Sequence, residues 1–198
     1  MDFENPPADP IAQLEQWLDE AEQTGLNTPT SMALATVDPD GRPSVRTVLL
    51  KGLDERGVVF YTNHNSRKAR ALEANPRAAL VFHWDPLERQ VTIEGPVTRV
   101  SDEESDAYFA TRPRGTQIGA WASDQSQPVE NRAVLEARVW DLLEEYREGD
   151  VPRPPYWGGY RVHPQRIEFW ISRLDRLHDR VEYLRRDDGG WRTRRLCP

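Results

Sequence analysis

The stretch Met32–Lys51, MALATVDPDGRPSVRTVLLK, contains two β-rich segments on either side of a turn. Met32–Val37 is a short apolar run, DPDG at 38–41 has the composition of a tight turn, and Ser44–Lys51 is rich in β-formers. This order is typical of an antiparallel hairpin. We therefore expect Ser44–Lys51 to be the return strand of a hairpin that begins at Met32.

The same pattern of short β-rich segments separated by turn residues continues along the chain. Further strands are predicted at Val58–Thr62, Ala78–Trp84, Gln90–Glu94, Val97–Val100, Tyr160–Val162, Arg166–Ile171, Leu177–Leu184 and Trp191–Leu196. Helices are expected from Asp9-Pro10 to near Gly25, from Ser101 through Phe109, and from near Pro128 to Gly149. Many short strands with few helices and no βαβ alternation predict a mainly β chain with α (α+β), built as an antiparallel barrel with flanking helices.

Length and charge narrow the classes of function. The 198 residues fit one domain, with residues 1–25 as an N-terminal segment and helix. Only 37% of residues are hydrophobic, which makes self-association plausible as a way to complete the core. The net charge of -7 argues against a nucleic-acid binder, and no apolar run reaches the length of a membrane span. A single cysteine, Cys197, allows no intrachain disulfide, so we expect a soluble cytoplasmic protein.

Signatures of several enzyme classes are absent from the sequence. There is no Gly-rich dinucleotide or P-loop fingerprint, no Gly-x-Ser-x-Gly elbow and no His-Glu-x-x-His motif. The four histidines have no metal-ligand spacing, so no metal site is expected. Any chemistry must therefore come from other segments.

Three basic segments are candidates for binding anions. Ser66 is placed to cap a helix whose first turn holds Arg67 and Lys68, where the helix dipole disfavours cations unless an anion binds there. Exposure to water is an equally good explanation for these two side chains. In the strand Arg46–Lys51, alternation puts the two terminal cations on opposite faces, and a charged edge that prevents aggregation explains them as well as a ligand does.

The third segment lies near the C-terminus. In an extended chain Arg176, His178 and Arg180 project from one face, where they repel one another unless an anionic ligand lies against them. Trp170 could pack on an aromatic ring of such a ligand. A solvent-exposed strand face is the alternative.

These segments resemble the pyridoxamine 5'-phosphate oxidase family, and the resemblance runs in order from about Pro7 to Pro198. The matching pieces are Arg46–Lys51, Phe60–Asn63, Ser66–Lys68, Leu87–Val91, Gln117–Trp121, Trp157–Tyr160, Glu168–Arg180 and Trp191–Pro198.

The resemblance implies an FMN-binding split β-barrel that forms a homodimer, with FMN sites at the subunit interface and residues 165–198 as a C-terminal dimerisation and active-site region. It implies FMN contacts by Arg46, Thr47, Val48, Leu49, Leu50, Lys51, Tyr61, Thr62, Arg67, Lys68, Gln90, Gln125, Ser126, Trp170 and Arg180. It implies that Lys51, Tyr108, Arg112 and Thr116 hold the substrate phosphate, and that Arg176 and His178 act at the reacting carbon as catalytic residues.

The reaction implied is oxidation of pyridoxine or pyridoxamine 5'-phosphate by O2 to pyridoxal 5'-phosphate and hydrogen peroxide, with ammonia from the amine, in vitamin B6 biosynthesis and salvage. Two alternatives stay open. One is a related flavin oxidase of the phenazine-biosynthetic type, and the other is a non-catalytic protein that binds FMN or pyridoxal phosphate.

Overall fold

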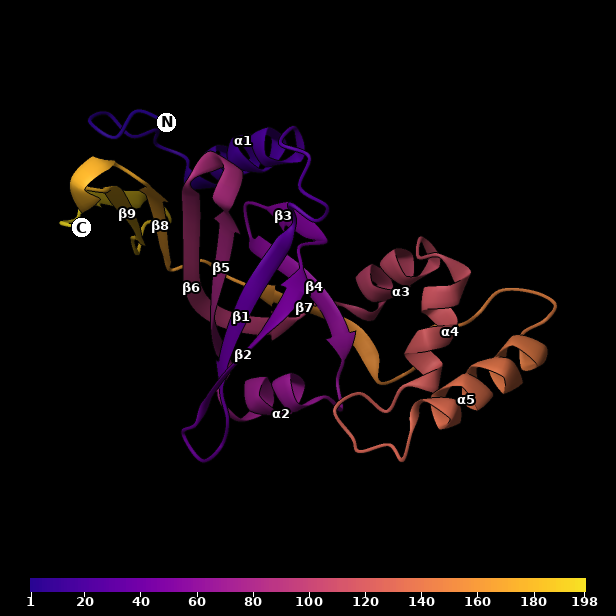
Figure 1. Ribbon diagram of the computed structural model, residues 1–198. Coiled ribbons are helices and arrows are strands. Elements are labelled where there is room, and N and C mark those ends of the chain that lie inside the picture. The colour runs from indigo at the N-terminus through magenta and orange to yellow at the C-terminus, as the bar shows by residue number, and fades with distance from the viewer.

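The ten strands form one antiparallel sheet that curls into a half-open barrel in the computed structural model, which describes residues 1–198 (Figure 1). The strands are β1 Ser31–Val37, β2 Pro43–Leu49, β3 Gly52–Asp54, β4 Gly57–Asn63, β5 Arg77–Trp84, β6 Arg89–Arg99, β7 Trp157–Val162, β8 Arg166–Ile171, β9 Asp179–Arg185 and β10 Trp191–Arg195. The main path runs β10-β9-β8-β6-β5-β1-β2, while β7 joins β6 to β4, and β4 pairs with β3. The predicted antiparallel split barrel is confirmed.

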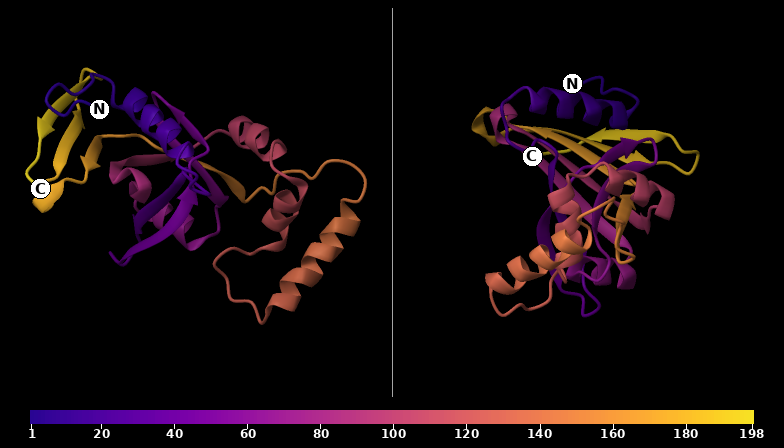
Figure 2. Two further views of the ribbon diagram at one scale, coloured as in Figure 1. Left: turned by 45° about the horizontal axis from the view of Figure 1, so that its top comes forward. Right: turned by 90° about the vertical axis from the view of Figure 1, so that its right-hand side faces the viewer.

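Five helices flank the barrel. They are α1 Pro10–Glu22, α2 Arg67–Ala74, α3 Asp102–Ala110, α4 Arg114–Ala122 and α5 Arg132–Glu145. Helices α3 to α5 lie together at one end of the molecule, and β8 to β10 lie at the other (Figures 1 and 2). None of the helices combines the length and apolar character needed to cross a bilayer.

The hairpin that opens the sheet forms as the sequence predicts. Residues of β1 and β2 pair in register from Ser31 with Leu49 to Val37 with Pro43. Because β2 ends at Leu49, strand alternation applies to Arg46 but not to Lys51, which lies beyond the strand. The side chain of Arg46 bonds to Thr36, which is 2% exposed, whereas Lys51 is exposed. The two cations therefore have different surroundings.

One strand replaces the two that were predicted between Gln90 and Val100. The turn expected at Gly95-Pro96 does not form, because β6 continues through it and changes partner, from β8 before Gly95 to β7 after it. A Cβ at Gly95 would lie 1.8 Å from the carbonyl oxygen of His163, so this glycine permits the close approach of the crossing chain. The glycine therefore marks where the sheet divides.

Local sequence signals placed two of the predicted helices well. Asp9 caps α1 by accepting from the amides of Ile11 and Ala12, and Ser101 caps α3 through the amide of Glu104. Helix α5 begins at Arg132 after the cap residue Asn131, later than the predicted start near Pro128. Helix α4 was not predicted, since two glycines weaken its helix signal, and it forms against α5.

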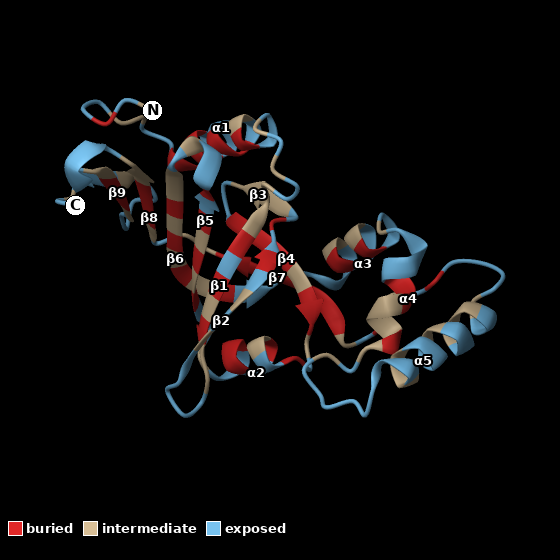
Figure 3. Cartoon of the chain, in the orientation of Figure 1, coloured by how far each residue is buried: buried red, intermediate tan, exposed pale blue.

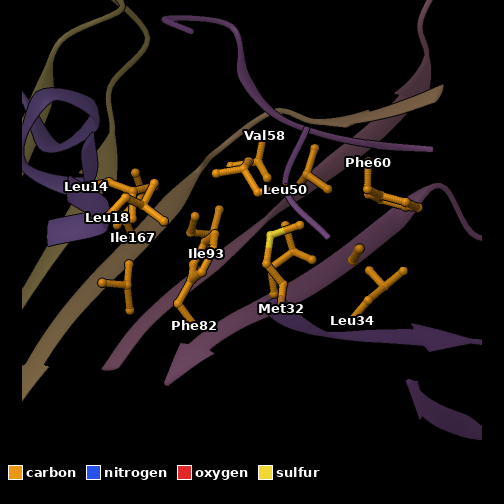
Figure 4. Packing of buried hydrophobic residues seen from close by; sticks show 14 of the residues in the cluster. Leu14, Leu18, Met32, Leu34, Leu50, Val58, Phe60, Phe82, Ile93 and Ile167 are labelled. Carbon is orange, nitrogen blue, oxygen red and sulfur yellow. The ribbon is translucent and has the colours of Figure 1, made fainter. Parts of the chain in front are cut away.

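The main core lies between the barrel strands and α1. In β6 and β8 alternate residues, Val91, Ile93, Ile167 and Phe169, point into it and are fully buried. The apolar face of α1 packs onto them, and Figure 4 shows Leu14 and Leu18 beside Ile167. In contrast α5 has no buried residue, and its ribbon carries only the intermediate and exposed colours in Figure 3. Its Trp140 is 71% exposed.

The predicted strand Leu177–Leu184 begins too early. Leu174–Arg176 form a 3-10 turn in which Asp175 and Arg176 have φ of 57° and 61°, and β9 begins at Asp179. The extended row of Arg176, His178 and Arg180 is therefore wrong, because the chain is not extended between the first two of these residues.

Candidate active site

A cavity of about 300 Å³ lies where β2 ends beside β4, α2 and α3. It is lined by Thr47, Val48, Leu49, Lys51, Tyr61, Thr62, Lys68, Tyr108, Arg112, Gln125 and Trp157. All of these except Trp157 were predicted as site residues. No carboxylate lines the cavity, although the chain has 33 acidic and 26 basic residues. The cavity is thus locally cationic in an acidic protein, which suits an anionic ligand.

A second cavity, of about 380 Å³, shares Arg112, Gln125 and Trp157 with the first. It contains Thr116, the remaining residue predicted to bind the substrate phosphate. The hydroxyl of Thr116 donates to the carbonyl of Pro113 at 2.7 Å, as is common in the first turn of a helix. The four residues predicted to hold the substrate phosphate therefore line two adjoining cavities, with Arg112 common to both.

Lys68 has only neutral partners in the first cavity. Its Nζ donates to Thr62 Oγ1 at 3.0 Å and to Gln125 Oε1 at 2.8 Å. Burial, and then the nearby Arg46, lower the pKa of Lys68 to about 8. A half-buried ammonium group with no counter-ion is stabilised by an anion, because the anion replaces interactions lost with water.

Arg46 and Arg67 lie close enough to Lys68 to form a cation cluster around the start of α2. Burial and the neighbouring Arg67 lower the pKa of Arg46, whose guanidinium bonds to Thr36, Ser44 and the carbonyl of Leu34. The amide of Arg67 donates to Ser126 Oγ at 3.1 Å, so Ser126 also lies at this helix start. A phosphate ester fits here because it would neutralise the cluster and the helix dipole together.

Three stacked aromatic rings hold Arg112 at the cavity. The Tyr61 ring lies 4.1 Å from that of Tyr108 and 5.3 Å from that of Trp157, and the guanidinium of Arg112 sits 4.6 Å from the Trp157 centroid. A Cβ at Gly159 would lie 2.8 Å from Tyr61, so this glycine leaves room for the stack. The Nη1 of Arg112 is buried with no hydrogen-bond partner. Arg112 lines both cavities, so the rest of its guanidinium is placed to pair with an anion there.

Trp157 is the residue that the sequence analysis did not include in the site. It was quoted as part of a matching segment, but no local pattern showed that its ring would lie under Arg112. The signal in the sequence was the pair of glycines that follows it, since small residues in a strand indicate a close neighbour.

The remaining predicted cofactor residues lie on the far part of the sheet. Gln90, Trp170 and Arg180 are register partners across β6, β8 and β9, so they form one row on the same face. The ring of His178 lies 4.6 Å from that of Trp170, and its Nδ1 accepts from the amide of Arg173 at 3.1 Å. Arg176 is exposed in the preceding 3-10 turn, between Leu174 and Leu177, which are 89% and 70% exposed.

Within one chain these two groups of residues stay apart. The cavity lies near α3 and β4, whereas the row on β8 and β9 is at the opposite end of the molecule (Figures 1 and 2). The side chain of Leu50 belongs to neither group, because it is buried in the core. The amide of Leu50 donates to the backbone carbonyl of Thr30. The residues predicted from the sequence therefore form two groups that one chain does not bring together.

Comparison with known proteins shows which family the chain resembles over both of these regions. Residues 18–144 match the pyridoxamine 5'-phosphate oxidase family, and residues 157–198 match the pyridoxine 5'-phosphate oxidase C-terminal dimerisation region. A relative from Rubrobacter xylanophilus, named pyridoxine/pyridoxamine 5'-phosphate oxidase, is 61% identical over 96% of this chain and 87% of its own length. Pyridoxine/pyridoxamine 5'-phosphate oxidase 1 of Ralstonia nicotianae is 55% identical over 100% of this chain and 93% of its own.

Solved structures show the same fold. The crystal structure of PhzG from Burkholderia lata, in complex with tetrahydrophenazine-1-carboxylic acid, has a TM-score of 0.92 and 35% identity, covering 99% of this chain and 96% of its own. A pyridoxamine 5'-phosphate oxidase-related, FMN binding protein from Nostoc punctiforme has a TM-score of 0.78 at 18% identity, over 98% and 100% of the two chains. With both family models and near full-length relatives in agreement, the chain belongs to the pyridoxamine 5'-phosphate oxidase family.

Proposed function

We propose that this protein oxidises pyridoxine or pyridoxamine 5'-phosphate with O2, using FMN, to pyridoxal 5'-phosphate and hydrogen peroxide. The amine substrate also takes up water and releases ammonia. The observation that carries the proposal is the carboxylate-free cavity lined by Lys51, Lys68 and Arg112 in a chain of net charge -7. Both the cofactor and the substrate are phosphate esters of aromatic rings, and cations beside stacked aromatic side chains suit that chemistry.

The residues divide between the two phosphates. The cluster of Arg46, Arg67 and Lys68 at the start of α2 holds the FMN phosphate, with Ser126 and Gln125 beside it. The guanidinium of Arg112, which lines both cavities, binds the substrate phosphate together with Lys51, Tyr108 and Thr116. Bound FMN supplies the redox chemistry, taking a hydride equivalent from the substrate's C4' and returning the electrons to O2.

Arg176 and His178 orient the substrate and handle protons near C4'. Because Nδ1 of His178 accepts from the Arg173 amide, the neutral ring carries its proton on Nε2. Nε2–H is therefore the donor that His178 offers to the substrate. The guanidinium of Arg176 is unpaired within the chain, so it is available to a substrate oxygen or to the ring.

A second subunit completes the site in this proposal. The turn that carries Arg176 is flanked by exposed Leu174 and Leu177, and α5 exposes Trp140, which are features of surfaces that another chain covers. Residues 157–198 match a dimerisation region. Pairing of two copies brings the β8–β9 row of one chain to the cavity of the other, and places two FMN sites at the interface.

One assay tests the function against its alternatives. The purified protein is expected to show flavin absorbance and to form hydrogen peroxide with pyridoxine or pyridoxamine 5'-phosphate. If the protein turns over tetrahydrophenazine-1-carboxylic acid but neither B6 phosphate, the phenazine-type alternative is supported, because PhzG is 35% identical to this chain. Bound FMN without peroxide from any of the three compounds would identify a binding protein. Absence of FMN binding would overturn the proposal.

FMN affinity is expected to weaken as pH rises above about 8. The free protein holds Lys68 with a lowered pKa of about 8, so below that pH the ammonium already carries its charge. Above it, binding a phosphate requires Lys68 to take up a proton, and Kd rises with pH by up to about tenfold per pH unit. The test is an FMN titration of the apoprotein between pH 6 and about 9.5. The Lys68→Arg variant keeps its positive charge throughout this pH range, so its FMN Kd should depend less on pH. If its Kd rises with pH as steeply as that of the unmodified protein, the role of Lys68 is wrong.

A further inference from the structure

Two buried carboxylates lie directly beneath the row of Gln90, Trp170 and Arg180. Glu168 and Glu182 are register partners on β8 and β9 and are 6% and 3% exposed. They share a face with Trp170 and Arg180, because all four occupy alternate positions on their strands. A buried carboxylate is costly unless it is paired and hydrogen-bonded, so the partners of these two groups show what each does.

The two carboxylates have different partners. Both contact Arg166, and Arg166 also pairs with Glu94. Glu182 otherwise pairs with Arg194 on β10. Glu168 instead accepts from Nε of Arg180 through Oε1 at 2.8 Å, while its Oε2 accepts from Arg166 at 2.8 Å. Glu168 is thus the only carboxylate bound to Arg180.

A second contact fixes the other edge of the Arg180 guanidinium. Its Nη1 donates to the backbone carbonyl of Cys197 at 2.8 Å. The segment after β10 is held nearby, since the amide of Leu196 donates to the carbonyl of Arg180. With Nε and Nη1 engaged, the planar guanidinium has one orientation, and Nη2 has no partner within the chain.

We propose that Glu168 and the carbonyl of Cys197 are positioning groups, which aim the free Nη2 edge of Arg180 at the flavin. This inference rests on the proposed function, because it takes Arg180 as an FMN ligand. It also explains why a carboxylate is buried beside a site for an anion. By its charge alone, Glu168 would weaken the binding of anionic FMN. By orienting Arg180, Glu168 strengthens that binding.

The chain supplies a matched control for this proposal. Glu168→Gln and Glu182→Gln remove the same charge from the same network of Arg166, and both are expected to lower the urea midpoint of the apoprotein. An amide replaces one of the two carboxylate oxygens with an NH2 donor, so the side chain of the Glu168→Gln variant cannot keep both the Oε1 contact with Arg180 and the Oε2 contact with Arg166. Only this variant is expected to weaken FMN binding, by about tenfold, the loss of one charge-assisted contact. The readout is FMN Kd from quenching of flavin fluorescence on titration into apoprotein.

The outcomes separate this inference from the proposed function. Failure of the unmodified apoprotein to bind FMN, or an unchanged Kd in Arg180→Ala, would overturn the proposed function or its use of Arg180. If Arg180→Ala weakens binding but Glu168→Gln and Glu182→Gln have equal Kd values, the positioning role is wrong.

Deletion of Cys197 and Pro198 tests the second contact without altering the buried network. It removes the carbonyl that accepts from Arg180, and we expect weaker FMN binding. Deletion of Pro198 alone leaves an acceptor at Cys197, and we expect binding to be retained. Equal binding by the two truncated proteins would overturn the role of Cys197. If the Glu168→Gln variant fails to fold, this pair of proteins still tests whether the orientation of Arg180 supports FMN binding.

Discussion

Arg176→Ala is expected to lower turnover of pyridoxamine 5'-phosphate by about 100-fold, the loss typical of one electrostatic contact at a reacting group. FMN affinity is expected to stay unchanged, because Arg176 lies in the turn before β9, outside the cation cluster on α2. Alanine has the same backbone preferences as arginine at the φ of 61° found here, so the turn itself is retained. The measurements are peroxide formation under single-turnover conditions and FMN Kd.

Arg173→Ala is the control for this loss. Arg173 lies in the same segment and pairs with Asp179 at 2.7 Å, while its contact with His178 uses the backbone amide, which alanine keeps. Normal turnover is expected in this variant. Equal losses in the two variants would mean that positive charge on the segment, and not Arg176 itself, supports the reaction. Loss of FMN from Arg176→Ala would show that its role is misassigned.

Arg67→Ala is expected to weaken FMN binding by roughly 10- to 100-fold, the value of a charge-assisted contact with phosphate. The side chain of Arg67 is 58% exposed, and its one ion pair, with Asp38, is long at 3.7 Å. A phosphate can therefore replace Asp38 as its partner. Its position in the first turn of α2 adds the helix dipole to the attraction. Titration of apoprotein with FMN measures the change, and turnover at saturating FMN should largely recover.

Arg70→Ala distinguishes a local contact from general charge. Arg70 lies one turn further along α2, bonds to the carbonyl of Asn65 and lines neither cavity of the site. Its loss removes the same charge from the same helix, so FMN Kd should change little. If both variants weaken FMN equally, the phosphate is not bound at the start of α2.

Local sequence patterns determined most of the secondary structure. The hairpin of β1 and β2 follows from β-rich segments around DPDG, and Asp9 and Ser101 cap helices through contacts within three residues. Such features depend on neighbours along the chain, so a single sequence contains them. The predictions that failed depend on distant residues. Helix α4 forms against α5, and β6 continues through Gly95 because His163 approaches it.

The candidate site divides in the same way. The sequence by itself determined which residues were candidates for the site, because a single sequence shows both the basic side chains of an acidic chain and the segments that match the family. Only the tertiary structure showed that Trp157 stacks on Tyr61 and lies under Arg112, and that Gln90, Trp170 and Arg180 share one row. Register and ring contacts join residues from separate strands. Their geometry is set by the packing of the whole sheet, which no local segment specifies.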